Sequence, residues 1–276
     1  MKMNNLKIFK NMTVTTKIII ANVVLFLIAE ILSSVIPGFY DYVAMRPEFI
    51  IHGKYLWTIF TSMFMHGGFA HLFFNMFSLW FVGRFVERII GSRRFLVFYL
   101  LSGIFAGIFF SILSGFFGFG ILANVFGNPA IPGIGASGAL FGLIGLVAML
   151  TPRNRVYLIL GPLIAIIIQA VIESLVNLGV ISTILNLLIS VYIFVSIFAI
   201  FSFNSKMRRL AIPVEMPFWL LPIIAIVPLV VIGLFVNLPI GNMAHLGGLV
   251  AGLAYGFYLR RRYKKKVKLL NRYFSR

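Results

Sequence analysis

The chain contains no cysteine, and only 6 of its 276 residues are acidic. Without cysteine it has no disulfide framework, no thiol nucleophile and no thiolate metal ligand. Charged residues of all kinds make up 11% of the chain, whereas a soluble domain has about 25%. A soluble globular enzyme is therefore excluded. Its 4 histidines and scattered acids form no ligand-spaced cluster, so we expect no metal and no cofactor.

Apolar residues, in contrast, make up 61% of the chain and include 30 phenylalanines, which excludes a disordered protein. Because a membrane span needs about 20 apolar residues, this length suits a bundle of many spans. We identify eight apolar runs: 18–36, 69–90, 95–117, 137–150, 156–178, 183–203, 217–236 and 243–259. The sequence therefore predicts one domain over 1–276, an all-α polytopic transmembrane helix bundle of about eight spans.

The first run follows a basic stretch, as the apolar part of a signal peptide does. It lacks a small-residue cleavage site, so we interpret it as a membrane span.

The net charge of +18 has two possible meanings. A basic protein can bind nucleic acid, but here Lys and Arg cluster at the ends of the apolar runs. If the N-terminus lies inside and eight spans alternate, the inside segments hold 20 of the 24 basic residues. These segments are 1–17, 91–94, 151–155, 204–216 and 260–276. Arg84 and Arg88 lie at the inner end of the second run, and only Arg46 and Lys54 fall outside. The positive-inside rule thus favours a multi-pass protein with both termini inside, and excludes a nucleic-acid partner.

The basic tail 260–276 would then lie at the inner surface of the lipid bilayer, where it can also contact anionic headgroups. We expect that bilayer to be a prokaryotic plasma membrane.

Two outside segments are long. Residues 37–68 are predicted to fold against the membrane surface. The Gly- and Pro-rich residues 118–136 are predicted to descend into the bundle as irregular backbone, covered by protein or a cavity.

Ser137 opens the fourth run, between Gly135 and Gly138. The run ends after 14 residues at Thr151-Pro152, so a helix there would cover about 21 Å of a roughly 30 Å hydrocarbon core. Ser137 is therefore predicted to lie below the outer surface of the membrane, where a polar side chain is costly and usually has a function. Alternatively, Ser137 is only an N-cap in a small-residue packing face.

His245 lies near the outer start of the last run, beside a small-residue face formed by Gly248 and Gly252. A histidine one turn into a span is a candidate base, although it could also be a packing or interfacial residue. His71 and Asn75 are four residues apart at the outer end of the second run, so they share a helix face. They could bond to each other for packing, or serve as hydrogen-bond donors. His66 does not share that face and is interpreted as structural.

The topology places these polar residues, from three distant stretches, at similar depth. Ser137 with His245 fits a nucleophile and its base. His71, Asn75 and the Ser137 N–H fit the donors that an acyl-transfer intermediate requires. No acidic residue is placed to orient His245, so we predict a dyad. Phe141, four residues after Ser137, could stack on the imidazole.

In these motifs the sequence resembles the rhomboid family of intramembrane serine proteases. The resemblance rests on His66, His71 and Asn75 (H-x4-H-x3-N), on Gly135, Ser137 and Gly138 (G-x-S-G), and on Ala244, His245, Gly248 and Gly252 (A-H-x-x-G-x-x-x-G), and covers roughly 50–150 and 213–260. It implies a six-span core, Ser137 as nucleophile, His245 as general base and acid, and His71, Asn75 and the Ser137 N–H as oxyanion site. It also implies that the substrates are single-span membrane proteins.

Two features depart from the family pattern. Phe141 stands where the family commonly has Tyr, which keeps the stacking but loses a hydroxyl. Residues 156–203 exceed the usual connection, so we predict an inserted helical hairpin there.

Two other classes of protein stay open. A catalytically inactive rhomboid-like protein would bind spans without cutting them, although the dyad argues against it. A transporter would bind a solute at broken helices, but no repeated halves are visible.

Overall fold

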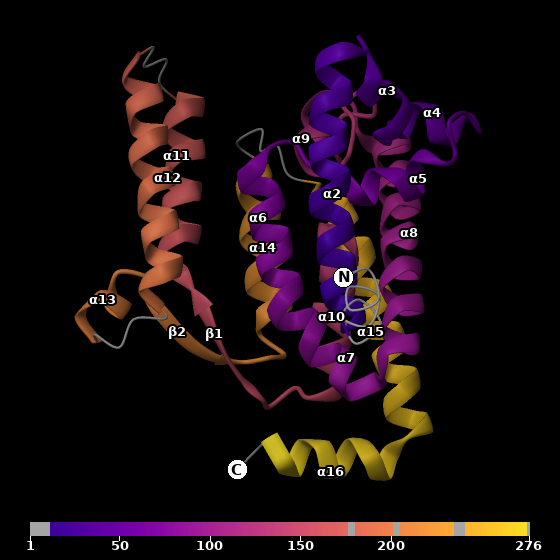
Figure 1. Cartoon of the computed structure of the whole chain (residues 1–276), viewed down its shortest axis with the longest axis vertical. Coiled ribbons are helices and arrows are strands. Elements are labelled where there is room, and N and C mark those ends of the chain that lie inside the picture. Colours follow the sequence, from indigo (N-terminus) through magenta and orange to yellow (C-terminus); the bar gives the residue numbers. More distant parts are fainter. Residues whose placement is uncertain (1–11, 176–179, 201–204, 235–240, 275–276) are drawn as a thin grey trace, which may run out of the picture.

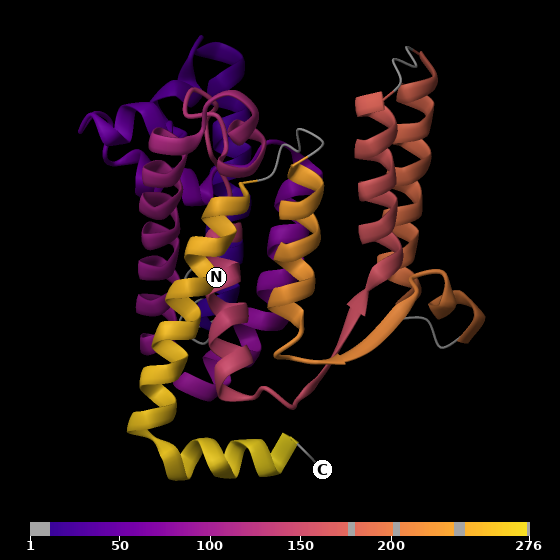
Figure 2. The same cartoon turned by 180° about the vertical axis from the view of Figure 1, so that it is seen from behind.

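The computed structural model describes residues 12–175, 180–200, 205–234 and 241–274. Figure 1 shows a bundle of lengthwise helices and, to one side of it, a hairpin of two further helices. Figure 2 shows the same separation from behind, with the C-terminal helix lying crosswise beneath the bundle. The structure is thus helical throughout its main body, as the sequence predicts for a transmembrane bundle.

The bundle contains helices that run along its long axis and correspond to six of the predicted spans. They are α2 (Val14–Val35), a continuous helix made of α6 (Phe69–Ser78), the π-helical turn η2 (Leu79–Gly83) and α7 (Arg84–Ile90), then α8 (Ser92–Phe117), α10 (Ser137–Leu150), α14 (Leu221–Gly233) and α15 (Asn242–Arg262). Among the described residues, α2, Phe69–Ile90 and α8 are long and apolar enough to cross a membrane. Shorter apolar helices, α10 and α14, lie beside them.

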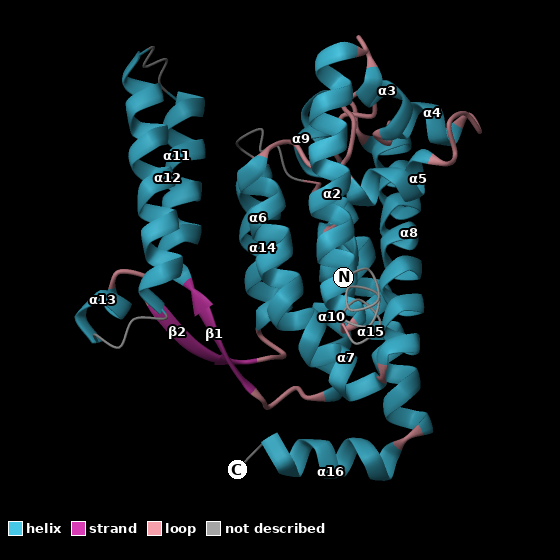
Figure 3. Ribbon diagram, viewed as in Figure 1, coloured by secondary structure: helices cyan, strands magenta, loops and turns pink. Residues whose placement is uncertain are grey.

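The fifth predicted span differs from the structure. Its first residues form a strand, β1 (Arg155–Ile159), which pairs antiparallel with β2 (Pro213–Pro217). Figure 3 shows this ribbon joining the bundle to the hairpin. The strand was not expected because its partner follows some 60 residues later, on the return of the chain. A pairing of that separation leaves no local signal in an apolar run.

The hairpin is formed by α11 (Leu160–Leu175) and α12 (Val180–Ile200), where the sequence predicts an inserted pair of helices. The short helix α13 (Ser205–Arg209) leads back to the ribbon. The hairpin contacts the bundle through two aromatic rings: Phe73 on α6 and Phe194 on α12 have their ring centres 6.3 Å apart. Helices α10 and α14 are thereby connected in sequence through a unit outside the bundle.

The two long outside segments meet at one end of the bundle. They contain short helices: α3 (Phe39–Val43), α4 (Pro47–Ile51), α5 (Thr58–Thr61), the 3-10 turns η1 (Ser62–Phe64) and η3 (Gly120–Leu122), and α9 (Ala123–Phe126). Backbone bonds in both directions join Met45 to Gly133, and the Glu48 N–H donates to the Pro129 carbonyl. The segment before Ser137 is therefore held by the first loop, as protein-covered irregular backbone requires.

The opposite end collects the basic residues, and we refer to it as the basic end. The α7–α8 turn, the last turns of α10 and α15, and α16 (Lys264–Phe274) all lie there (Figures 1 and 2). Gly91 makes the turn between α7 and α8 with φ +84°, a conformation that glycine adopts without steric penalty. The basic clusters after α7, after α10 and from Arg260 onward thus share one end of the molecule, whereas Lys2, Lys7 and Lys10 lie outside the described residues.

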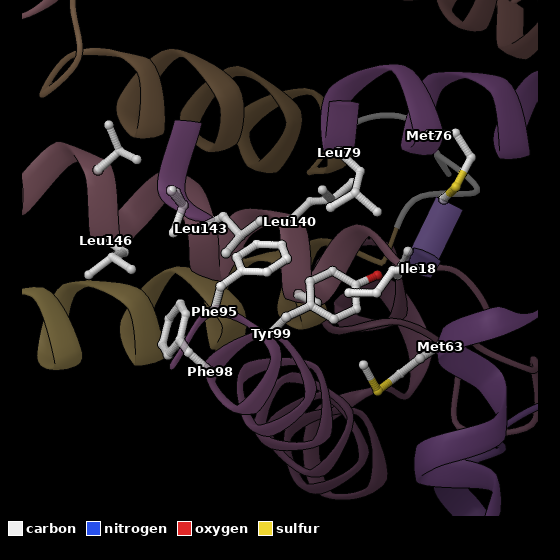
Figure 4. Packing of buried hydrophobic residues seen from close by; sticks show 14 of the residues in the cluster. Ile18, Met63, Met76, Leu79, Phe95, Phe98, Tyr99, Leu140, Leu143 and Leu146 are labelled. Carbon is white, nitrogen blue, oxygen red and sulfur yellow. The ribbon is translucent and has the colours of Figure 1, made fainter. Parts of the chain in front are cut away.

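The core fills the middle of the bundle, between α2, α6, α8 and α10. Figure 4 shows Phe95 of α8 beside Leu143 of α10, with Tyr99 and Leu79 in the same cluster. All four side chains are fully buried. Transfer of each large apolar side chain from water into the core contributes roughly 1.5–3 kcal/mol to stability. For a side chain that would otherwise face lipid, the contribution comes from tight dispersion contacts. This packing anchors the basic-end half of α10.

Glu87 is the buried acid of the bundle, and it caps a helix in another part of the sequence. Its carboxylate accepts hydrogen bonds from the Val14 N–H (2.8 Å), the Thr15 N–H (2.9 Å) and the Thr15 hydroxyl (2.6 Å). The Ser92 hydroxyl donates to it as well, at 2.7 Å. The first N–H groups of a helix have no partner within it, and a negative charge there is favourable. Glu87 thereby joins α2, α7 and α8 at the basic end.

Replacing Glu87 by Gln should lower stability without affecting the polar site at the other end. An amide cannot accept all of these bonds and sets an NH2 group against backbone donors, which we expect to cost about 1–3 kcal/mol. The measurement is the thermal unfolding midpoint in detergent, with Glu48→Gln as the control. Equal midpoints for the two variants would contradict the assigned role.

Candidate active site

Ser137 and His245 lie side by side although 108 residues separate them in the chain. Ser137 is the first residue of α10, and His245 lies in the first turn of α15. The Ser137 Oγ is 2.9 Å from the His245 Nε2, within hydrogen-bonding distance. Both residues are partly buried, and the Nδ1 atom of His245 is fully buried. The structure thus brings together the nucleophile and base that the sequence predicts.

The backbone before α10 explains why the Ser137 side chain is free to make this bond. Gly135 has φ +120°, which a residue with a side chain rarely adopts. Ala136 occupies the N-cap position, and no side chain caps the helix. The interpretation of Ser137 as an N-cap is therefore wrong: Ser137 lies one residue inside the helix, and its hydroxyl meets His245.

Helix lengths place Ser137 within the bundle rather than at its surface. The Leu150 carbonyl, at the last turn of α10, accepts a bond from Asn271 of α16 at the basic end. Measured from that end, the 14 residues of α10 rise about 21 Å and the 26 residues of α8 rise about 39 Å. Ser137 therefore lies well short of the far end of α8.

Glycines bring the backbones of α10 and α15 into contact. A Cβ atom added at Gly248 would lie 1.9 Å from the Gly138 carbonyl oxygen, and one added at Gly252 would lie 2.1 Å from the Gly142 oxygen. No side chain fits at either position. Small residues are the usual means by which membrane helices approach so closely. This contact fixes the distance between the helix starts that carry Ser137 and His245.

Phe141 lies one turn below Ser137 and stacks on the imidazole of His245. The ring centres are 4.2 Å apart and the planes differ by 8°. The other ring nitrogen, Nδ1, is buried and has no hydrogen-bond partner among the described residues. Phe141 therefore stacks on the face of the ring, as the sequence predicts, and no carboxylate of the described residues bonds the Nδ1 atom.

His71 and Asn75 of α6 lie against the backbone of Gly135. The Cβ position of Gly135 is 2.8 Å from the His71 Nε2 and 3.5 Å from the Asn75 Nδ2. The Gly67 N–H donates to the His71 Nδ1 at 3.4 Å, so in the neutral ring the proton is on Nε2. The Asn75 Nδ2 is buried and unpaired. Mutual bonding of His71 and Asn75 is not found in the described structure; two donors instead face the segment that leads to Ser137.

His66 and Ser62 support this arrangement from the first loop. His66 is fully buried, and its ring meets that of His71 edge to face at 5.1 Å. The Ser62 carbonyl accepts a bond from the Gly135 N–H at 2.9 Å. The sequence carried no signal for Ser62, because any residue supplies a backbone carbonyl. Within the described residues, no group of three or more histidines and acids gathers as a metal site would require.

Comparison with known proteins agrees with these motifs. The model of the rhomboid domain family matches residues 53–192 and 189–262. The rhomboid protease GluP of Bacillus subtilis is 37% identical over 112 residues, which are 41% of this chain and 19% of that protein. RHOMBOID-like protein 1 of Arabidopsis thaliana is 31% identical over 137 residues, 50% of this chain and 31% of that protein. The chain thus spans less than a third of the length of these relatives.

One relative bears a different description. The inactive RHOMBOID-like protein 8 of Arabidopsis thaliana is 38% identical over 99 residues, which are 36% of this chain and 24% of that protein. Similarity of this degree therefore accompanies both active and inactive proteins. The distinction depends on the side chains of the site.

Replacing Gly248 by Val should separate α10 from α15. Overpacking a tight contact costs about 1–3 kcal/mol, so the thermal unfolding midpoint should fall. Gly241→Ala is the matched control on the same helix, since a Cβ there would meet its nearest neighbour, Ala244, at an ordinary 3.6 Å. A Gly248→Val protein as stable as the control would contradict the close contact described above.

Proposed function

The chain belongs to the rhomboid family and is an integral membrane protein, and from this premise we propose that it is an intramembrane serine endopeptidase. Its proposed substrates are membrane proteins with a single span. The observation that supports catalysis best is the Ser137–His245 pair, 2.9 Å apart at the start of a helix that begins inside the bundle. The pair has the geometry of a hydroxyl nucleophile with its base.

In the proposed acylation step, the Ser137 Oγ attacks the carbonyl carbon of the scissile peptide bond. His245 Nε2 takes the hydroxyl proton as the new C–O bond forms. The same proton is then delivered to the leaving nitrogen, the C–N bond breaks, and the amine fragment departs. The other fragment stays on Ser137 as an ester.

In deacylation, water attacks the ester carbon while His245 again accepts a proton. The intermediate collapses, the proton returns to the Ser137 oxygen, and the substrate fragment leaves as a carboxylic acid. Water can approach because Ser137 and His245 are both partly exposed. Hydrolysis therefore needs no group beyond those described and no cofactor.

The negative oxygen of each tetrahedral intermediate requires hydrogen-bond donors. Three are proposed: the His71 Nε2–H, the Asn75 Nδ2–H and the Ser137 N–H. The first two lie against Gly135, and the third belongs to a first-turn residue whose N–H has no partner within the helix. Donors already in place lose no energy by reorganising during the reaction, and each contributes about 10²–10³ in rate.

The site also constrains the substrate. The carbonyls of a helix are already hydrogen-bonded within the helix, so a transmembrane segment must unwind before Ser137 can attack it. Substrates are therefore proposed to carry helix-weakening residues near the cleaved bond. Small residues beside that bond would fit an approach as close as Gly135 permits.

The alternative function is that of an inactive rhomboid-like protein that binds spans without cutting them. One similar protein is described as inactive. The side chains of this chain favour activity, since the dyad and both donor side chains are present and meet at one place. The transporter alternative has no comparable support.

We also propose that the protein lies in the plasma membrane of a prokaryotic cell, with the basic end and both termini on the cytoplasmic side. The support is the accumulation of Lys and Arg at that end, opposite to Ser137. The hairpin α11–α12 is proposed to be an insertion into a six-helix core. Its position outside the bundle supports this, as does the meeting of the two family matches within α12.

Purified protein in liposomes should cleave a single-span reporter, and Ser137→Ala or His245→Ala should abolish the cleavage. Asn75→Ala should reduce it about 10²-fold, since one oxyanion donor is lost. Fragment release is followed on gels, and reaction of Ser137 with a fluorophosphonate is followed in parallel. Ser102→Ala, a change in the neighbouring helix α8, serves as the control.

Each result decides between the two functions. Cleavage and labelling that both need Ser137 support the protease. Absence of both in the folded wild-type protein favours the inactive binding protein, and cleavage by Ser137→Ala at the wild-type rate would exclude this serine as the nucleophile.

Replacing Phe141 by Leu should lower kcat with little change in KM, because the imidazole loses its stacking partner while the reporter-binding surface remains. We expect a reduction of about tenfold, equivalent to about 1.4 kcal/mol. Phe141→Tyr should retain most of the activity. Equal kcat values for the Leu and wild-type proteins would contradict an orienting role for Phe141.

A further inference from the structure

A cavity that is open to the surface lies at the basic end, where α10, α15 and α16 meet, and Phe257, Arg260, Arg261 and Lys264 of its lining are exposed. It has a volume of about 360 Å³ and is lined by Met149, Phe257, Arg260, Arg261 and Lys264. Two of these residues are apolar and three are cationic. The cavity is at the opposite end of α10 and α15 from Ser137 and His245, so it is separate from the candidate active site.

The three cations of the cavity have no acidic partner. Within the described part of the chain, no carboxylate pairs with Arg260, Arg261 or Lys264; the ion pairs found there join Arg46 to Asp41 and Arg155 to Glu215. Glu87, the buried acid of this end, is occupied by α2 and Ser92. Like charges around one cavity repel each other, and an anion bound between them would relieve that repulsion.

Helix α16 contributes its first residue, Lys264, to the lining of the cavity and is bonded to the bundle. The Asn271 Nδ2 donates to the Leu150 carbonyl at 2.8 Å, and Val267 packs against the main core. The helix lies crosswise to the bundle axis (Figures 1 and 2). Lys264, Lys268 and Arg272 follow each other at intervals of four residues and so share one face. A basic amphipathic helix in this orientation lies at the level of lipid headgroups.

The composition of the cavity identifies the class of ligand. Three cations would suit any phosphate, but Met149 and Phe257 offer an apolar surface that a free phosphate cannot use. Arg261 lies over the Phe257 ring, 4.3 Å from its centre, which brings charge and apolar surface together. A molecule with a phosphate next to hydrocarbon matches both, and basic pockets between membrane helices bind such headgroups.

We propose that this cavity binds one anionic phospholipid, with its phosphate between Arg260, Arg261 and Lys264 and its glycerol and first acyl carbons on Met149 and Phe257. The lipid would connect the ends of α10, α15 and α16. The proposal does not depend on proteolysis, and it differs from a general attraction of basic residues to the membrane in predicting one site of defined composition.

The test measures lipid binding to the full chain by native mass spectrometry, with phosphatidylglycerol and phosphatidylcholine added in detergent. The triple variant Arg260→Gln, Arg261→Gln, Lys264→Gln removes the cavity cations. The triple variant Lys206→Gln, Arg208→Gln, Arg209→Gln removes the same charge from α13, which lies beside the hairpin. We expect wild type and the α13 variant to retain one phosphatidylglycerol and the cavity variant to bind it at least tenfold more weakly.

Arg260→Gln alone gives a second measure, because a single exposed side chain can change without unfolding the protein. It should weaken phosphatidylglycerol binding severalfold. Equal loss in both triple variants, or equal binding of the two lipids, would overturn the proposal in favour of general charge attraction. Full competition by millimolar inorganic phosphate or glycerol phosphate would overturn it in favour of a simple anion site.

Discussion

Contact between the backbones of α10 and α15 is the constraint on which the polar site depends. Ser137 and His245 each lie at the start of their helix, so their separation follows from how closely the two helices approach. Lipid tails are as apolar as the surface of such a helix, so no hydrophobic effect drives two helices together in a membrane. Their association rests instead on close packing between small residues. Gly248 and Gly252 allow that packing because they leave room for the carbonyl oxygens of Gly138 and Gly142. A shift of a few tenths of an ångström would already weaken a hydrogen bond of 2.9 Å.

The site contains buried polar atoms that have no hydrogen-bond partner in the described structure. The Asn75 Nδ2, the His66 Nε2 and the His245 Nδ1 are all buried without partners in the described structure, and each such group costs about 1–3 kcal/mol. The other half of the bundle offsets this cost. There Glu87 satisfies the first donors of α2, and α10 packs through Leu143 and Leu146 into the apolar core. The packed core thus supports a site with several unpaired polar atoms, although Asn22 and Tyr99 carry such atoms elsewhere in the bundle.

The two ends of α10 and α15 therefore differ in chemistry while sharing the same helices. One end holds a hydroxyl, an imidazole and donors without partners; the other holds cations around an apolar-floored cavity. The hairpin α11–α12 does not disturb the packing of α10 against α15. The ribbon β1–β2 places the hairpin to one side of the bundle and returns the chain to α14. Some forty residues thus form a hairpin between the two site helices without interrupting the contact of α10 with α15.

The sequence by itself determined the membrane class, the order of the helices and the polar residues of the site. Apolar runs, clustered basic residues and misplaced polar groups are local signals, and Ser137, His245, His71 and Asn75 were all found from them. Only the tertiary structure decided how these residues meet. The distance from Ser137 to His245, the position of Gly135 against His71 and Asn75, the bond from Ser62 and the strand pairing of Arg155–Ile159 each join segments far apart in the chain. Such contacts arise from the packing of whole helices, so no short stretch of sequence contains them.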